Sequence, residues 1–474
     1  MKKLIYLSFL SVLISGIYSC EVETELLEIP DSTIQRIVDS AVSAASTAAA
    51  NAATNAVNAA FNAEEAAQAL ANAAPESIDH TGYITSDETW KKESIHYLTD
   101  KVIVPDGVIL TIEAGTIIKA RQHSNPEDSA ALIVARGGKI FAIGDSKAPI
   151  IFTSELDNIK KDHTYPNGSP NLTAEDYQLW GGLMVMGKAR ISVDTNEIEF
   201  AIEGIPAEDT FRLYGGTDDT DSSGVLDYVS IRHGGEQIGA SNEINGLTLG
   251  GVGTGTRISN IEIYANFDDG IEFFGGTVDA ANLIVWSCGD DGIDTDQSYN
   301  GSISNVVVIM NQDPTASRGG DHGLELDGKE GDYAAANPTS ASITGFTFKG
   351  NAGSEIGQLR DGKRVHISNI YAFNLSVESG EGDLSIETDS NPLDKDHGED
   401  EFVDGFSSLN DIEVVLPSGK TLEDIFPNYN TTHPGFPSSA FTAFKSITTP
   451  SSGQGADTSF FSWTLAKTSG VLDF

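Results

Sequence analysis

The chain has 474 residues, more than one ordinary compact domain holds, and its 48 glycines with 8% aromatic residues favour many strands joined by tight turns. Seventy Asp and Glu against 28 Lys and Arg leave a formal net charge of −42. Such a surface repels phosphates and anionic lipid, which argues against nucleic acid and a bare membrane surface as partners, and it attracts divalent cations.

Residues 1–19 are predicted to be a signal peptide. Two lysines precede the apolar stretch from Leu4 to Ile17, which is too short to span a bilayer. The stretch ends at Ile17-Tyr18-Ser19-Cys20. This segment resembles the lipobox of bacterial lipoproteins, although Tyr18 is bulky for its place, and the resemblance implies cleavage before Cys20 and lipidation of its sulfur.

Residues 20–30 would form the lipid anchor and an acidic tether. The run Glu21-Val22-Glu23-Thr24-Glu25 resembles the surface-export signal of some Gram-negative lipoproteins. We therefore expect an outer-membrane protein that faces the cell exterior and contacts the membrane only through its lipid. The periplasmic face of the same membrane is the alternative.

Residues 31–75 are predicted to form a helical stalk. Asp31-Ser32-Thr33 offers an N-cap, the run to Ala74 is rich in alanine, the best helix former, and Pro75 ends the pattern. The apolar stripe is too sparse to make a core of its own. Cleavage before Cys20 would leave Cys288 as the second cysteine of the mature chain, and its apolar surroundings predict a buried side chain.

Residues 80–474 are predicted to form a parallel β-helix body with a C-terminal cap. Short apolar runs broken by glycine turns occur at 101–118, 131–140 and 148–153. Long amphipathic helices do not separate these runs, which argues against a sheet built from alternating strands and helices.

Internal repetition supports this fold. Similar short segments recur along the chain, and each contains one turn residue at the same aligned position. These residues are separated by steps of 33, 22, 23, 40 and 24: Asp227, Asn260, Asn282, Asn305, Gly345 and Asn369. A base period near 22–24 residues with two longer insertions indicates an all-β, right-handed parallel β-helix. The asparagines should stack in one column and bond to each other.

Several glycine-rich segments resemble a largely uncharacterised family of exported bacterial β-helix lipoproteins over roughly residues 80–474. The segments are Trp180–Gly187, Tyr214–Asp219, Tyr228–Gly235, Asn245–Gly251 and Asp269–Gly276. The resemblance implies the β-helix fold and an exported, lipid-anchored protein.

An acidic motif recurs on successive coils, at Asp268–Glu272, Asp290–Asp294 and Asp321–Glu325. Coils stack about 4.8 Å apart, so three rows should form: Asp268, Asp290 and Asp321; Asp269, Asp291 and His322; Glu272, Asp294 and Glu325. Three interpretations remain open: calcium binding, acid–base catalysis, and turns whose Asp side chains bond nearby backbone. The first would use eight carboxylates to bind one or more Ca²⁺ ions: Asp268, Asp269, Glu272, Asp290, Asp291, Asp294, Asp321 and Glu325.

The order of motifs also resembles that of polygalacturonase-type glycoside hydrolases, which are β-helices too. That resemblance implies that Asp268, Asp290 and Asp291 supply acid and base and that His322 supports one of them. It further implies that Arg360 and Lys363 hold a uronate. Phe267 and the split basic motif depart from the family pattern. A lyase would need a basic residue such as Lys329 or Arg318 beside Ca²⁺.

Two further features are candidates for ligand contacts. Trp180, Tyr214, Phe274 and Tyr299 could stack against sugar rings, although core packing explains most aromatics in such coils. The acidic loop Asp389–Glu401 could bind Ca²⁺ loosely. The predicted function is non-catalytic and calcium-stabilised binding of a glycan or of an outer-membrane protein partner, such as a transporter. The alternative is a polysaccharide hydrolase or lyase.

Overall fold

The computed structural model describes residues 30–73, 75–161, 169–193, 197–203, 205, 210–236, 244–330, 339–377, 382–387, 397–426, 442–451 and 453–474. Cys20, the predicted signal peptide and most of the tether lie outside the described residues, as does the acidic loop from Asp389 up to position 396. The chain divides into two units, Met1–Ala73 and Ala74–Phe474, which are taken separately below.

The first unit contains one long helix, α2, which spans Asp31–Ala73. It begins slightly earlier than the expected N-cap, because the amides of Thr33 and Ile34 already donate to the carbonyl of Pro30. Asp31 therefore lies in the first turn, where its negative charge interacts favourably with the helix dipole. Among the described residues, none of the helices combines the length and apolarity needed to cross a membrane.

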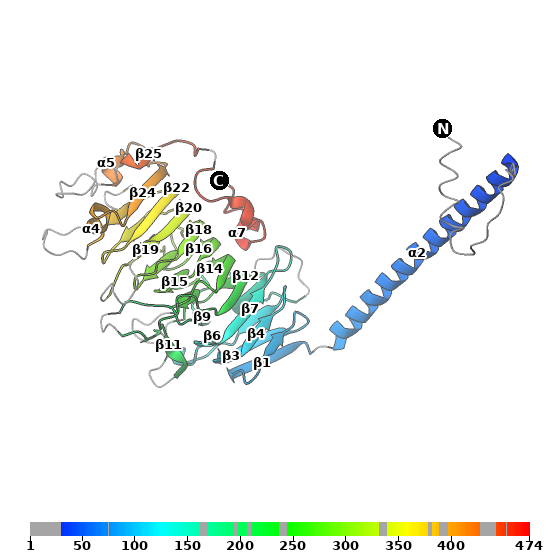
Figure 1. The fold of residues 1–474 in the computed structure, drawn as a ribbon. Coiled ribbons are helices and arrows are strands. Elements are labelled where there is room, and N and C mark those ends of the chain that lie inside the picture. The colour runs from blue at the N-terminus through cyan, green and yellow to red at the C-terminus, as the bar shows by residue number, and fades with distance from the viewer. Residues whose placement is uncertain are drawn as a thin grey trace, which may run out of the picture. The chain divides into compact units, whose positions relative to one another are not determined.

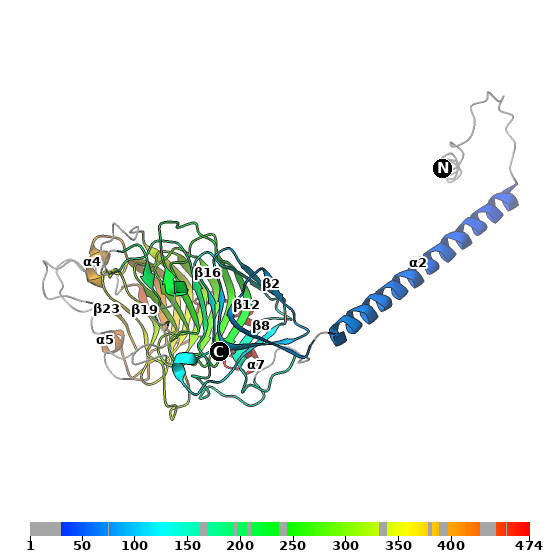
Figure 2. The same cartoon turned by 90° about the horizontal axis from the view of Figure 1, so that it is seen from below.

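The second unit is the parallel β-helix, a stack of strands that runs from β1 to β25 (Figures 1 and 2). Its strands are β1 Ser77–Tyr83, β2 Glu88–Trp90, β3 Ile95–Val104, β4 Ile109–Ile112, β5 Ile117–Ala120, β6 Ala131–Val134, β7 Lys139–Ile143, β8 Ile150–Ser154, β9 Leu183–Met186, β10 Phe200–Ala201, β11 Leu213–Tyr214, β12 Gly224–Arg232, β13 Leu247–Gly250, β14 Arg257–Tyr264, β15 Ile271–Phe274, β16 Ala280–Trp286, β17 Ile293–Asp296, β18 Ser302–Ile309, β19 His322–Leu326, β20 Ala341–Lys349, β21 Glu355–Leu359, β22 Val365–Phe373, β23 Leu384–Ile386, β24 Ser408–Val414 and β25 Phe444–Ser446. The named strands pair in parallel, apart from the antiparallel pair β10–β11.

Short helical segments occupy some of the connections between strands and part of the C-terminal segment. They are η1 Pro126–Asp128, η2 Thr210–Arg212, α4 Gly398–Val403, α5 Leu422–Ile425, η4 Thr458–Phe461 and α7 Leu465–Thr468. Ile425 and Phe426, at the end of α5, are buried in the same core as Val414 of β24.

From β12 onward each coil combines a long strand with a short one. The long strands β12, β14, β16, β18, β20, β22 and β24 pair in one series, and β13, β15, β17, β19, β21 and β23 pair in another. Apolar side chains that alternate along both series point into one continuous core, which includes Ile271, Ile293 and Leu324. The predicted right-handed parallel β-helix is therefore confirmed.

A residue in the left-handed backbone conformation bends each long strand from β12 to β24. Asn260, Asn282 and Asn305 occupy this position with φ of 53°, 58° and 58°. Asn282 Nδ2 donates to Asn260 Oδ1 at 3.1 Å, and Asn305 Nδ2 donates to Asn282 Oδ1 at 2.8 Å. Asparagine adopts this conformation at lower cost than most residues, and its amide completes the ladder. The predicted asparagine column is confirmed over these coils.

The first member of the column differs from the prediction by one residue. Asp227 pairs with Ser259, so Tyr228, with φ of 54°, lies in register with Asn260. The Asp227 carboxylate still accepts a hydrogen bond from Asn260 Nδ2 at 2.7 Å. The predicted column therefore began one position too early, because the left-handed residue of β12 is Tyr228 and not the polar Asp227.

The C-terminal segment packs along the outside of the coils. Phe461, Ala466 and Leu472 are buried against Ile284 of β16 and Val307 of β18. These contacts explain why the outward positions of the two strands are apolar.

Beside these apolar contacts, the same segment covers a charged pair. The amide of Ala466 donates to Glu262 Oε1 at 3.0 Å, and Glu262 Oε2 lies 3.6 Å from a terminal nitrogen of Arg232. Both charged side chains are almost fully buried. The C-terminal segment therefore closes a buried charge pair as well as an apolar surface.

Candidate functional site

The third predicted row of carboxylates lies on the outward positions of the short strands. Glu272 of β15 pairs with Asp294 of β17, and Asp294 pairs with Glu325 of β19. Their neighbours along each strand point into the core, so alternation turns the three carboxylates to the outer face. Here we call this surface the carboxylate face.

The second predicted row joins consecutive coils through backbone hydrogen bonds. Asp269 Oδ1 accepts from the amide of Asp291 at 2.9 Å, and Asp291 Oδ1 accepts from the amide of His322 at 2.6 Å. Asp291 Oδ1 also lies 2.9 Å from His322 Nδ1. These bonds differ from the turn interpretation, which expected bonds to local backbone, because each aspartate bonds the backbone of the next coil.

The first predicted row is more open. Asp268 and Asp290 are half-buried, and Asp290 Oδ2 lies 3.9 Å from a terminal nitrogen of Arg318. Asp321 is the exception, because 58% of its side chain is exposed. It is absent from the compact carboxylate groups found among the described residues, whereas Asp268 and Asp290 form one with Asp269.

Three groups on this face place ligand atoms close enough to share a cation. They are Asp268, Asp269 and Asp290; Asp269, Glu272 and Asp294; and Asp291, His322 and Glu325, with the ligand atoms of each group within 4.8 Å of one another. Six to eight oxygens at about 2.3–2.6 Å suit Ca²⁺. Within the described residues, Asp294 Oδ1 and Asn245 Oδ1 are buried without a hydrogen-bond partner. Such orphaned oxygens fit a calcium ligand set.

Burial and mutual repulsion dominate the electrostatics of the face. Burial first, and neighbouring carboxylates second, raise the pKa of Asp269, Glu272 and Asp294 well above the usual range. Burial also raises the pKa of Asp290. Burial and repulsion therefore both favour the protonated form of these groups when no cation is bound.

The neighbouring carboxyls of Asp291 and Glu325 have pKa values shifted in opposite directions. Burial raises the pKa of Asp291 well above its usual range, and its hydrogen bond to Glu325 raises it further. Burial alone would raise the pKa of Glu325, but the bond from Asp291 and the Arg360 guanidinium lower it overall. The opposite shifts favour the proton on Asp291 and the negative charge on Glu325. Asp291 is 2% exposed, which leaves little room for a reacting substrate.

The carboxylate face extends beyond the predicted rows. Burial raises the pKa of Asp296 on β17 well above its usual range. Burial and the nearby Glu355 raise the pKa of Asp383 to about 8. Asp296 could have been found from sequence, because it follows Asp294 by two residues and strand alternation places both on one face. Asp383 has no such signal.

The basic residues expected to hold a uronate serve other purposes. Arg360 donates to Asp327 Oδ1 at 2.9 Å and Oδ2 at 2.6 Å, and also contacts Glu325. Lys363 is 1% exposed, donates to Thr295 Oγ1 at 2.6 Å, and burial lowers its pKa to about 8. The predicted role of these two residues is therefore wrong: one is neutralised by adjacent carboxylates and the other lies inside the coil.

The aromatic candidates are also explained by packing. Trp180, Tyr214, Phe274 and Tyr299 are all buried, Phe274 the least at 7% exposure. Tyr214 packs against Phe274 with ring centroids 5.9 Å apart, and its hydroxyl donates to Gln297 Oε1 at 3.0 Å. A sugar ring cannot reach these four rings, which confirms core packing as their main role.

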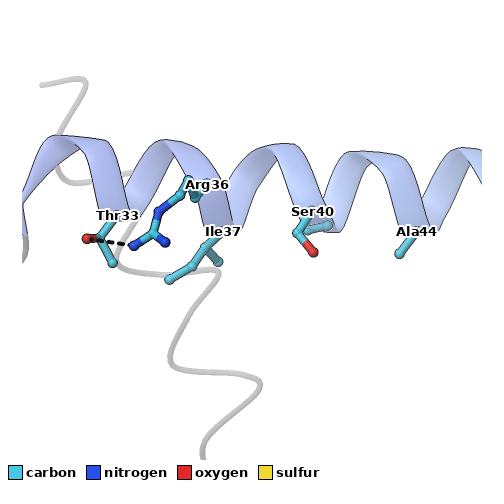
Figure 3. A pocket seen from close by; sticks show the side chains of 6 residues that line it. Thr33, Arg36, Ile37, Ser40 and Ala44 are labelled. Carbon is cyan, nitrogen blue, oxygen red and sulfur yellow. Dashed lines mark hydrogen bonds between the residues drawn. The ribbon is translucent and has the colours of Figure 1, made fainter.

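A hollow occurs on helix α2. Its lining includes Thr33, Arg36, Ile37, Ser40 and Ala44, all on one side of the helix (Figure 3). Arg36 donates to Thr33 Oγ1 at 3.4 Å. A single helix supplies the described lining, so the hollow is open, and Arg36 and Thr33 bond each other there. The carboxylate face is therefore the stronger candidate site.

Comparison with known protein families agrees with this architecture. The model of the pectate-lyase-like β-helix domain family matches residues 82–468. Among solved structures, the pectin methylesterase from Aspergillus niger is 9% identical, with a TM-score of 0.30 over 77% of this chain and 87% of that one. The pectate lyase Pel9A is 14% identical, with a TM-score of 0.29 over 60% and 67%. A search of curated proteins finds no match. The chain belongs to the family of pectate-lyase-like β-helix domains.

Proposed function

We propose that this protein is a lipid-anchored surface protein that binds a glycan through calcium held on its carboxylate face, without cleaving it. One observation carries the proposal: Glu272, Asp294 and Glu325 are stacked in register on consecutive coils, and Asp294 keeps a buried oxygen without a hydrogen-bond partner among the described residues. A cation between the coils would supply the missing partner.

The energetic reason is repulsion. Two unit charges about 5 Å apart at an effective dielectric near 20 repel by roughly 3 kcal/mol. Ionising the whole face without cations would repeat that cost along the stack. Protonation relieves it at low pH, and calcium would relieve it at neutral pH, where a cell exterior commonly supplies the ion.

Several observations favour binding over catalysis. The Asp291 carboxylate accepts from the backbone amide of His322 and lies within hydrogen-bond distance of its ring, and both side chains are buried. Arg360 and Lys363 are committed to neighbouring residues. The description of the family supports a carbohydrate as the ligand, and calcium bound to the face could bridge to acidic groups on such a chain. An envelope protein is the other partner that a surface location would allow.

The test combines binding with turnover. Purified protein is titrated with polyuronates and with neutral glycans, in millimolar Ca²⁺ and in chelator, while reducing ends and unsaturated products are assayed. Calcium-dependent binding without product supports the proposal. Product that Asp290→Asn abolishes, and Asp106→Asn on the exposed turn after β3 does not, would establish a polysaccharide hydrolase or lyase instead.

The proposed location is the outer face of the outer membrane, with Cys20 lipidated. It rests on the lipobox resemblance, the acidic tether and the net charge of −42. Protease treatment of intact cells should remove the body, and Cys20→Ser should release the protein from the membrane fraction. Protection of the body while a known surface protein is digested would place it on the periplasmic face.

A further inference from the structure

A lysine side chain lies inside the solenoid, behind the carboxylate face. Lys363 follows β21 and is 1% exposed. Its Nζ donates to Thr295 Oγ1 at 2.6 Å and to the carbonyl of Asp327 at 3.0 Å, and it lies 5.8 Å from the centroid of the Tyr299 ring. Lysine is rarely buried without a charged partner, because removing an ammonium from water is costly. An apolar side chain of the same length would fill this space at lower cost, so the charge itself needs a role.

Within the described part of the chain, the charge of Lys363 is not cancelled by a direct ion pair. The two oxygens that accept its hydrogen bonds are neutral, one from a hydroxyl and the other from a backbone carbonyl. Arg360, which lies in the same turn, instead pairs with the carboxylates of Glu325 and Asp327. The positive charge of Lys363 is therefore available to groups beyond its direct contacts.

Strand β17 separates this ammonium from the carboxylate face. Thr295 points inward and is 1% exposed, whereas Asp294 and Asp296 on either side of it are half-buried, as strand alternation requires. Burial lowers the pKa of Lys363 to about 8, which leaves the ammonium charged at pH 7. The carboxylates of Asp327, Asp296 and Asp294 act in the opposite direction, because they attract the ammonium. Lys363 and the acidic face therefore interact through the strand without touching.

The turn after β21 directs Lys363 into the coil. Asp361 and Gly362 adopt left-handed backbone conformations with φ of 50° and 64°. The amide of Lys363 then donates to the carbonyl of Arg360 at 3.0 Å, which closes the turn. Because β21 pairs with β19 and β19 pairs with β17, the side chain reaches past one coil to its hydrogen-bond partner on β17. The ammonium is therefore held in a defined place and is not carried on a free surface side chain.

We propose that Lys363 is a built-in counter-ion of the carboxylate face that weakens the binding of calcium and thereby sets its affinity, an inference that rests on the proposed function. A fixed positive charge behind Asp294 and Asp296 competes with an external cation for the same negative charges. In the dry interior this competition is stronger, and less screened by salt, than that of a surface lysine. Extracellular modules typically bind calcium at about 10⁻⁴–10⁻³ M, and a built-in counter-ion would bring a face with this many carboxylates towards that range.

The test measures the calcium affinity of the full chain, purified in detergent, by calorimetry at pH 7. Lys363→Met keeps an unbranched side chain of similar length and removes the charge. We expect its dissociation constant for Ca²⁺ to be roughly tenfold lower than that of the wild type, because one nearby repulsive charge is gone. The same factor should appear at about 0.1 M and about 0.5 M KCl, because a buried charge is little screened. A packing defect would instead weaken binding, so the direction of the change separates the two explanations.

Three further variants complete the test. Lys445→Met makes the same substitution at an exposed lysine, whose Nζ lies 3.2 Å from Asp411 Oδ1. Thr295→Val removes a hydrogen bond of Lys363 and keeps its charge. Both of these controls should bind calcium like the wild type. Lys363→Gln keeps a hydrogen-bond donor without the charge, and it should bind calcium as tightly as Lys363→Met.

Thermal melts establish that each variant is folded. Unchanged or weaker calcium binding by folded Lys363→Met, or equal tightening in Thr295→Val, would overturn the inference and leave calcium binding in place. Failure of both Lys363→Met and Lys363→Gln to fold would show a structural role for the lysine and would overturn the inference as well. If the wild type binds no calcium and Lys363→Met does, the proposed function fails and the counter-ion stands. If neither protein binds calcium, both proposals are refuted.

Discussion

Replacing Asp294 with asparagine should stabilise the protein without calcium and reduce its response to calcium. Asp294 lies between Glu272 and Glu325, so the change removes the central charge of the row. Each ionised neighbour about 5 Å away contributes roughly 3 kcal/mol of repulsion at an effective dielectric near 20. At pH 8 in chelator, Asp294→Asn should therefore be more stable than the wild type, by roughly 3 kcal/mol for each of the two neighbours that is ionised.

The pH dependence follows from the raised pKa values. For Asp269, Glu272 and Asp294 the folded-state pKa exceeds the unfolded value, so the folded state binds more protons. Their favourable contribution is complete below the unfolded pKa near 4 and is lost as the pH rises through the folded values. In chelator, the wild type should lose stability between pH 5 and pH 8, and Asp294→Asn should lose less.

Calcium should narrow the difference between the two proteins. At a free concentration a hundredfold above the dissociation constant, binding to the folded state alone adds about 2.7 kcal/mol. For a body of about 400 residues with an unfolding entropy of roughly 2.1 cal/mol/K per residue, that is about 3 °C in the melting temperature. The gain should grow from pH 5 to pH 8, because calcium displaces protons from the carboxyls.

Thermal melts at pH 5 and pH 8, in Ca²⁺, Mg²⁺ and chelator, measure these effects. Mg²⁺ demands tighter octahedral geometry and should stabilise less. Calorimetry in two buffers of different ionisation enthalpy counts the protons released. Asp106→Asn, a change of equal charge at an exposed carboxylate near Lys188, is the control. If calcium leaves the wild-type midpoint unchanged at both pH values, the carboxylates act through turn chemistry alone.

Three further predictions concern stability. Asn282→Ala removes both ladder hydrogen bonds and places alanine at φ of 58°, so urea unfolding should show a loss of roughly 2–3 kcal/mol in the free energy of unfolding. Asn282→Gly should lose less stability, and an equal loss would argue against backbone strain. Burial lowers the pKa of His80 and His96 to about 4, so the unfolded chain binds more protons than the folded one. Stability should therefore fall as the pH drops from about 6.5 towards 4. His96→Gln should flatten that part of the curve of stability against pH. Glu262→Gln leaves Arg232 buried without its charged partner and should cost about 3 kcal/mol, with faster proteolysis of the C-terminal segment than in the wild type.

The repeat in the sequence was sufficient to predict the solenoid and the rows of polar side chains. Asn260, Asn282 and Asn305 recur at nearly one coil length, and stacking then places them in contact whatever the loops do. The same reasoning brought Glu272, Asp294 and Glu325 into register. Periodicity alone determined these contacts, because neighbouring coils are related by a fixed translation.

Only the tertiary structure decided which carboxylates are buried and which basic residues remain available. Arg360 reaches Asp327, Lys363 turns into the coil, and Arg318 stacks on Phe267. These outcomes depend on connections of unequal length and on side-chain direction at the turns, neither of which repeats from coil to coil. The C-terminal segment that covers Glu262 from about 200 residues further along the chain is the clearest case, because no local pattern records where a distant segment packs.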